Sequence, residues 1–266
     1  MDGIQILIGF FLAALIAFAG YRAGALTLDG AAGAVLVGGV TFGFGGWLPA
    51  VLLILFFVSS SALSRIGRSR KRDLSSAFAK TGQRDISQVL ANGLMAATSS
   101  AIYGVTNETI WLAGLAGALA AVNADTWSTE LGVLAHRSPR LITNGSRVEP
   151  GTSGGVTLEG TLAAVGGAAL IAVVSGIATM DFLLGIGIVV GGVMGALVDS
   201  LLGASIQAMY YCPSCNKQTE RHPTHTCGTD TYQIRGWSWM TNDVVNFIAS
   251  MTGAIIAGII WILAKG

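Results

Sequence analysis

Long uninterrupted apolar runs are the feature that most constrains how this chain can fold. A membrane-spanning helix needs about 20 predominantly apolar residues. Eight segments reach or approach that length, at residues 4–20, 30–46, 48–63, 89–105, 110–126, 160–178, 182–202 and 244–263. Because these runs are continuously apolar and do not alternate, they predict helices and not the strands of a membrane β-barrel.

The overall composition excludes most soluble classes of protein. Charged residues make up 11% of the 266 residues, whereas a soluble domain carries about 25%. This argues against an ordinary soluble enzyme, a disordered tail and a disulfide-stapled secreted domain. Fifteen basic and fourteen acidic residues nearly cancel, so no nucleic-acid partner is expected. We expect an all-α polytopic membrane helix bundle, forming a single transmembrane domain over residues 1–266.

The connections between the predicted helices indicate an orientation in the membrane. Those after the second, fourth and sixth helices are very short, and those after the third, fifth and seventh are long and polar. With eight helices, every basic residue except Lys265 falls on the side of the long connections. Positively charged loops remain in the cytoplasm, so both termini should lie outside the cell membrane. The basic loop at residues 65–84 needs no further role than topology or contact with anionic lipids.

A cleaved signal peptide is the competing interpretation of residues 1–20. The sequence Ala17-Phe18-Ala19 resembles a cleavage site, but the chain starts Met1-Asp2 without a basic region. A retained helix is therefore expected.

Polar residues gather at the predicted cytoplasmic ends of four helices. A carboxylate at membrane depth costs about 2.5 kcal/mol or more unless it is paired or hydrated. The residues concerned are Asn123, Asp125 and Glu130 on the fifth helix, Asp199 on the seventh, Asn242, Asp243 and Asn246 on the eighth, and Arg84, Gln88 and Asn92 at the fourth. Such oxygen ligands suit Mg²⁺, which also binds substrate phosphates. Helix capping and interhelical hydrogen bonds are the alternative explanation.

Two glycine-rich patterns accompany these polar residues. Gly187, Gly191, Gly195 and Gly203 recur at multiples of four around Asp199, which predicts close helix packing beside that carboxylate. The loop before the sixth helix carries Gly154, Gly155 and Thr157. Glycine N–H groups next to a helix N-terminus can bind phosphate. The turn is not a Walker A motif, and a plain flexible loop remains the alternative.

A cluster of cysteines and histidines lies in the last long loop, at residues 207–242. Cys212 and Cys215 form a C-x₂-C pair, followed by His222, His225 and Cys227. This spacing is typical of a tetrahedral Zn²⁺ knuckle with a structural role. We expect Cys212, Cys215, His225 and Cys227 to be the ligands. Redox chemistry or no bound metal are the alternatives.

Several of these motifs together resemble the transmembrane-protein-19-like family, also called domain of unknown function 92. The resemblance is carried by residues 84–93, 123–132, 154–157, 199–204, 211–228 and 242–246. The plant branch of that family is similar to phytyl-phosphate kinases, with the CTP-using dolichol and phytol kinases as more distant relatives. The resemblance therefore implies transfer of a phosphoryl group from a nucleoside triphosphate to an isoprenyl monophosphate. CTP is the donor that the resemblance favours.

The expected site combines Mg²⁺ ligands with phosphate-binding groups. We expect Asp125, Glu130 and Asp199 to hold Mg²⁺, with Asn123 or Asp243 completing the shell. Arg84 would offset phosphate charge, with Arg137 or Arg147 as substitutes, while Gly154, Gly155 and Thr157 bind phosphate.

Two other functional classes stay open at this point. One is a transporter or flippase for a lipid or small anion, and the other is a transferase that forms a CDP-lipid. The expected partners are an isoprenyl lipid phosphate, a nucleotide and membrane lipids. The glycine ridges would also permit a homo-oligomer.

Overall fold

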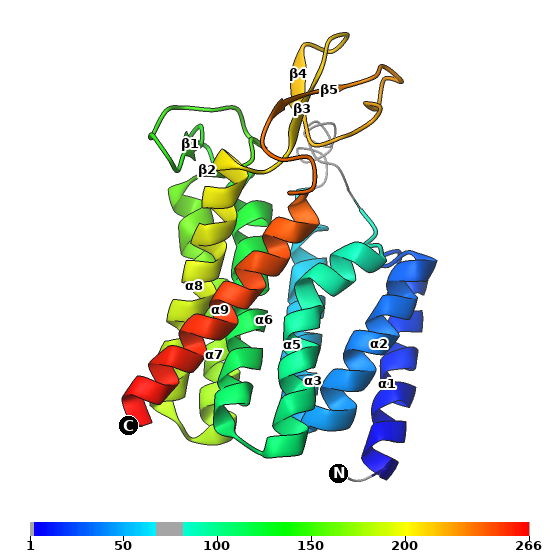
Figure 1. Cartoon of the computed structure of the whole chain (residues 1–266), viewed down its shortest axis with the longest axis vertical. Coiled ribbons are helices and arrows are strands. Elements are labelled where there is room, and N and C mark those ends of the chain that lie inside the picture. The colour runs from blue at the N-terminus through cyan, green and yellow to red at the C-terminus, as the bar shows by residue number, and fades with distance from the viewer. Residues whose placement is uncertain (1–2, 68–81, 266) are drawn as a thin grey trace.

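The computed structural model describes residues 3–67 and 82–265, which form a helix bundle with short strands at one end (Figure 1). The helices described are α1 (Gly3–Arg22), α2 (Leu28–Gly45), α3 (Trp47–Leu63), α5 (Ile86–Thr106), α6 (Thr109–Gly132), α7 (Leu158–Thr179), α8 (Phe182–Ser205) and α9 (Asn242–Lys265). Each coincides with one of the eight apolar segments, so the prediction of helices is confirmed. α6 continues well beyond its expected end at residue 126, and this extension carries Glu130.

The helices suit a membrane environment. Five of them, α1, α2, α7, α8 and α9, are long and apolar enough to cross a bilayer, and α3 is a shorter apolar helix. Large apolar side chains such as Leu7, Phe11 and Ile177 are more than 60% exposed on the outer surface. Exposed apolar side chains of this size mark a surface that contacts lipid or a partner. The total of eight spans stays a prediction.

α6 is the central helix of the bundle. It packs against α3, α5, α7, α8 and α9, and every residue from Leu112 to Ala124 is buried. Most of these residues are alanine or glycine, which lets neighbouring backbones approach closely in the absence of bulky side chains. The core is therefore built from small residues around one axis.

The α8 glycines bring Asp199 into the interior of the bundle. A Cβ at Gly191 would lie 2.6 Å from the carbonyl oxygen of Gly253 on α9. At Gly195 it would meet Ala121 of α6 at 2.5 Å. Residues four apart share a helix face, so Asp199 follows these glycines toward α6 and α9. The predicted close packing beside Asp199 is confirmed.

The described parts of the long connections gather at one end of the bundle, and the two ends of the described chain lie at the opposite end (Figure 1). β1 (Arg140–Leu141) pairs with β2 (Gly155–Val156) before α7. β3 (Met209–Cys212), β4 (Lys217–Thr219) and β5 (Tyr232–Arg235) form an antiparallel sheet in the order β4-β3-β5. Of the basic residues, Arg68, Arg70, Lys71, Arg72 and Lys80 lie outside the described residues.

Candidate functional site

A polar cavity of about 850 Å³ lies where the helices meet the long connections. Its wall is formed by the ends of α3, α6 and α8, the beginnings of α5 and α9, the glycine turn before α7, strand β3 and the segment after β4. Twelve of the predicted site residues line it: Arg84, Gln88, Asn92, Asp125, Glu130, Gly154, Gly155, Thr157, Asp199, Asn242, Asp243 and Asn246. The structure thus brings together groups that are far apart in the sequence.

Asp125 and Asp199 form the acidic centre of this cavity. Asp125 lies close enough to Asp199 for the two carboxylates to interact electrostatically, and Glu220 acts on Asp199 in the same way. The Oδ2 atom of Asp199 is buried without a hydrogen-bond partner in the described part of the chain. A buried carboxylate oxygen without a donor is costly, and a bound cation would remove that cost. These two acids therefore fit a Mg²⁺ site that is completed by substrate phosphates and water.

Glu130 lines the same cavity but has different neighbours. It accepts a hydrogen bond from the hydroxyl of Ser64 on α3, and it interacts electrostatically with Arg84. Within residues 3–67 and 82–265, the three acids do not come close enough together to count as one group of metal ligands. The geometry therefore associates Glu130 with Arg84, while Asp125 and Asp199 form the acidic pair.

Arg84 is fixed in position by both its backbone and its side chain. Its N–H donates to Ala25 at 2.9 Å, and its carbonyl accepts from the N–H of Thr27 at 3.1 Å. The guanidinium donates to the hydroxyls of Ser61 at 2.9 Å and Ser60 at 3.1 Å. Burial lowers the pKa of Arg84, and the charge of Glu130 opposes that shift. A buried, oriented guanidinium of this kind is suited to bind phosphate oxygens.

Three sequence-based assignments are not supported by the geometry. Asn123 is fully buried and does not line the cavity. Its amide donates to Gly167 at 2.8 Å and its oxygen accepts from Ser59 at 3.1 Å. Asn123 thus joins α3, α6 and α7, and it is not among the residues that line the cavity with Asp125 and Asp199. Arg137 and Arg147 also lie outside the cavity wall, so neither is positioned to substitute for Arg84.

The glycine turn packs against the end of α8. Gly154 has a φ of +80°, and a Cβ there would lie 2.4 Å from Ala204. Only glycine fits this combination of left-handed backbone and close approach. Thr157 is the N-cap of α7, and its hydroxyl accepts from the N–H of Gly160 at 3.0 Å. The turn therefore brings backbone and a helix N-terminus to the cavity wall, as an anion site requires.

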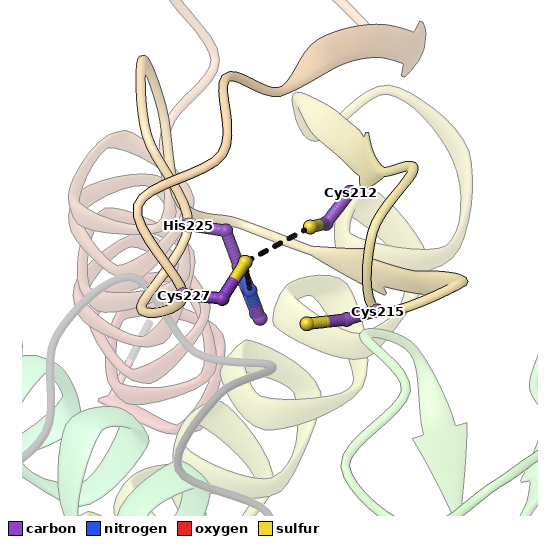
Figure 2. A group of neighbouring side chains, drawn as sticks. All are labelled: Cys212, Cys215, His225 and Cys227. Atoms are coloured by element: carbon purple, nitrogen blue, oxygen red, sulfur yellow. Dashed lines mark hydrogen bonds between the residues drawn. The ribbon is translucent and has the colours of Figure 1, made fainter.

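The four cysteine and histidine side chains expected to bind metal point toward one another (Figure 2). Their ligand atoms all lie within 4.8 Å of one another. Sγ of Cys212 is 3.5 Å from Sγ of Cys227, which is 3.4 Å from Nδ1 of His225. Two thiolates about 2.3 Å from a tetrahedral Zn²⁺ would be separated by about 3.8 Å. The cluster can therefore hold a metal ion with little rearrangement.

The electrostatics of the cluster also favour a cation. Hydrogen bonds with Thr229 and His225 lower the pKa of Cys227 to about 5. The hydrogen bond with Cys227 and the neighbouring sulfurs raise the pKa of Cys215 to about 11. Thiolate is the form that binds metal, and a divalent cation would offset the repulsion between crowded sulfurs.

The cysteine cluster belongs to a unit that also closes the cavity, which the sequence did not indicate. The Nε2 group of Gln207 donates to Glu220 at 2.7 Å, and its Oε1 accepts from the hydroxyl of Ser153 at 3.0 Å. Glu220 and His222 line the cavity, and His222 stacks on Tyr210 with ring centroids 4.5 Å apart. No local pattern around Glu220 signals this role, because it depends on how the sheet docks on the bundle.

A family model matches most of the chain. The model described as integral membrane protein DUF92 covers residues 11–254. This chain belongs to the DUF92 family of integral membrane proteins. The predicted family resemblance is thereby confirmed, and the match includes every residue that lines the cavity.

Similar proteins are found in a plant and in an archaeon, among other organisms. The chain is 31% identical to Protein PGR of Arabidopsis thaliana over 96% of both chains. It is also 31% identical to the uncharacterized membrane protein MJ0933 of Methanocaldococcus jannaschii over 98% of both. Protein VTE6, chloroplastic, of Arabidopsis thaliana is 26% identical over 87% of this chain and 64% of that protein. No solved structure matches the chain.

Proposed function

We propose that this DUF92 protein is a membrane phosphotransferase that converts an isoprenyl monophosphate to the diphosphate with a nucleoside triphosphate. The observation that carries the proposal is the polar cavity at one end of an apolar bundle, which combines an acidic pair, a fixed arginine and a glycine turn. The choice of CTP as donor and of an isoprenyl acceptor rests on the family resemblance. We further propose that the cavity faces the cytoplasm in the cell membrane, because the described parts of the long connections, with basic residues such as Arg140 and Arg147, lie at that end.

Asp125 and Asp199 are the residues that would hold Mg²⁺. The orphaned Oδ2 of Asp199 and the adjacent carboxylate of Asp125 provide the hard oxygen ligands that this ion prefers. Asp243 also lines the cavity, and we propose that it completes the site. When bound, the ion would neutralise charge on the nucleotide phosphates.

The reaction itself needs positioning more than proton transfer. An oxygen of R–O–PO₃²⁻ attacks the γ-phosphorus of the nucleotide, and the bond from that phosphorus to the β–γ bridging oxygen breaks. The products are R–O–P₂O₆³⁻ and the nucleoside diphosphate, so atoms and charge balance. The attacking oxygen is already ionised, so no general base is required, and catalysis reduces to orientation and charge stabilisation.

The residues of the chain divide these tasks between them. Arg84 would bind the acceptor phosphate, with its orientation set by Ser60 and Ser61. Backbone N–H groups of the glycine turn, at Gly154 and Gly155, would contact the nucleotide phosphates. Gln88, Asn92, Asn242 and Asn246 would supply further hydrogen bonds from α5 and α9.

The test measures transfer of label from nucleotide to lipid. Purified protein is incubated with a panel of polyprenyl alcohols and monophosphates, Mg²⁺, and γ-labelled CTP or ATP, and products are separated by chromatography. We expect labelled isoprenyl diphosphate from the wild type, and loss of product in Asp125→Asn and Asp199→Asn. Glu159→Gln is the matched control, because Glu159 is exposed on α7 and does not line the cavity. Full activity of both aspartate variants would contradict the assignment.

The same panel separates the other functional classes. A CDP-lipid-forming transferase would release pyrophosphate and retain the nucleotide on the lipid. A transporter or flippase would move labelled substrate across proteoliposomes without consuming nucleotide. Either result would replace the kinase proposal, although the cavity and its acids would remain the site.

A further inference from the structure

A second, apolar cavity of about 160 Å³ lies among α1, α2, α3 and α5. Its wall is formed by aliphatic and aromatic side chains, among them Ile16, Ala34, Val37, Val51, Ile54 and Phe57. Of these helices, α1 and α2 lie on the side of the bundle opposite α7 and α8 (Figure 1), while α3 contacts α7 and α5 contacts α9. We call this cavity the apolar groove.

The apolar groove and the polar cavity share part of their walls. Arg84, Gln88 and Asn92 line both, and they follow one another at four-residue intervals. The guanidinium of Arg84 lies 5.7 Å from the ring centroid of Phe57, while its nitrogens bind Ser60 and Ser61. A fixed positive charge therefore stands where an apolar compartment meets a polar one.

We propose that the apolar groove binds the hydrocarbon tail of a single-chain lipid monophosphate whose phosphate lies at Arg84. This inference rests on the proposed function and specifies which part of the protein binds the hydrocarbon tail of the substrate. The order of these features matches the order of groups in such a ligand. The apolar groove would bind the tail, the guanidinium of Arg84 would bind the phosphate, and the acidic pair of Asp125 and Asp199 lies in the cavity beyond. One groove accommodates one chain, so a diacyl phosphate is expected to bind poorly.

The groove would act on selectivity more than on affinity. Lipid tails in a bilayer are about as apolar as leucine side chains, so moving a tail from membrane to groove provides little driving force. The phosphate contact with Arg84 would supply most of the binding, and the shape of the groove would determine which tails fit. A side chain that fills the groove should therefore discriminate against long tails.

A matched pair of substitutions on α2 provides the test. Ala34 is half-buried and lines the groove, whereas Ala32 is exposed and does not. We expect Ala34→Phe to lower kcat/KM for a long polyprenyl monophosphate about tenfold or more. The loss should be much smaller for a short, water-soluble isoprenyl monophosphate, whose tail leaves most of the groove empty, and Ala32→Phe should behave as the wild type on both substrates. If Ala34→Phe does not fold, Val51→Phe narrows the groove from α3, with Val58→Phe as its control because Val58 is on the same helix but does not line the groove.

A binding measurement separates this inference from the proposed reaction. A long-chain polyprenyl monophosphate with a photoreactive group in its tail is cross-linked to the protein without nucleotide, and labelled peptides are mapped. We expect labels on α1, α2 and α3 that Ala34→Phe reduces, and that unlabelled polyprenyl phosphate displaces better than phosphatidic acid.

The possible results have distinct meanings. Labels on α7–α9, or labelling unchanged by Ala34→Phe, would overturn the groove proposal even if phosphoryl transfer occurs. Equal displacement by phosphatidic acid would make the groove a general lipid site, which also contradicts the proposal. Groove labelling without nucleotide consumption would contradict the kinase proposal and leave the tail site standing.

Discussion

Gln207 and Glu220 connect the helix bundle to the cysteine cluster through one hydrogen bond of 2.7 Å. Gln207 follows α8 directly, whereas Glu220 lies between the two halves of the cluster, after Cys215 and before His225. Because the oxygen of Gln207 also accepts from Ser153, the same side chain reaches the glycine turn. The amide of Gln207 thus holds together the end of α8, the glycine turn and the segment that carries Glu220, which are three parts of the cavity wall.

Replacing this amide should loosen the cavity wall. Gln207 is 1% exposed, and Gln207→Leu removes the hydrogen bonds that its amide makes with Ser153 and Glu220. A hydrogen bond contributes about 0.5–1.5 kcal/mol, and about 1.5–3 kcal/mol when one partner is charged, so we expect a lower melting temperature in detergent together with reduced transfer. Gln218→Leu is the control, since Gln218 is exposed on β4. A Gln207→Leu protein as stable and active as the control would show that the bridge is dispensable.

Separate substitutions of His225 and His222 test which of the two histidines is a zinc ligand. His225 lies within the metal-binding cluster, whereas His222 stacks on Tyr210. We expect His225→Ala to lose bound zinc, measured by elemental analysis, and to melt at a lower temperature, because the metal stabilises a loop without a core of its own. His222→Ala should keep its zinc. Zinc lost from His222→Ala but retained in His225→Ala would reverse the assignment.

The sequence predicted the helices well and the direction of individual side chains less well. Continuous apolar runs locate helices, because only helices satisfy the backbone within lipid. Because these runs are apolar on all sides, they do not indicate which face of a helix points toward the interior of the bundle. Asn123 and Asp125 are two residues apart on α6, yet Asn123 binds Ser59 and Gly167 while Asp125 lines the cavity. The α6 sequence alone could not separate a packing amide from a site carboxylate.

The position of Glu220 in the cavity wall could not be predicted either, and the reason is a different one. The C-x₂-C spacing located the cysteine cluster, since zinc ligands have characteristic separations. How that unit docks depends on contacts distant in sequence, such as the guanidinium of Arg235, which donates to the carbonyls of Ala204 at 2.8 Å and Gly203 at 2.6 Å. The docking brings Glu220 beside Asp199.

Gly30 provides a test of how Arg84 is positioned. A Cβ at Gly30 would lie 2.1 Å from the backbone carbonyl oxygen of Arg84, so Gly30→Ala must displace the segment that carries the arginine. Overpacking of this kind costs about 1–3 kcal/mol, and we expect a lower melting temperature and weaker acceptor binding, seen as a raised KM. Gly166→Ala is the matched control, because its nearest neighbour is Trp127 at 3.7 Å. Equal KM values in the two variants would contradict this account.

The charge and the shape of Arg84 can be separated by two substitutions. Arg84→Gln removes the charge, and we expect transfer to fall by about 10²–10³-fold, the usual loss when a group that stabilises developing charge is removed. Arg84→Lys keeps the charge but cannot reach both Ser60 and Ser61 in the same way, because an ammonium lacks the planar fork of a guanidinium. Its activity should lie between those of Arg84→Gln and the wild type.

The control for this pair is Arg147→Gln, since Arg147 does not line the cavity. We expect Arg147→Gln to keep wild-type activity, measured as labelled diphosphate formed per unit of folded protein after size-exclusion chromatography. Comparable losses in Arg84→Gln and Arg147→Gln would point to a diffuse effect of positive charge at this end of the bundle. The fixed guanidinium between Ser60, Ser61 and Phe57 would then have no specific part in binding phosphate.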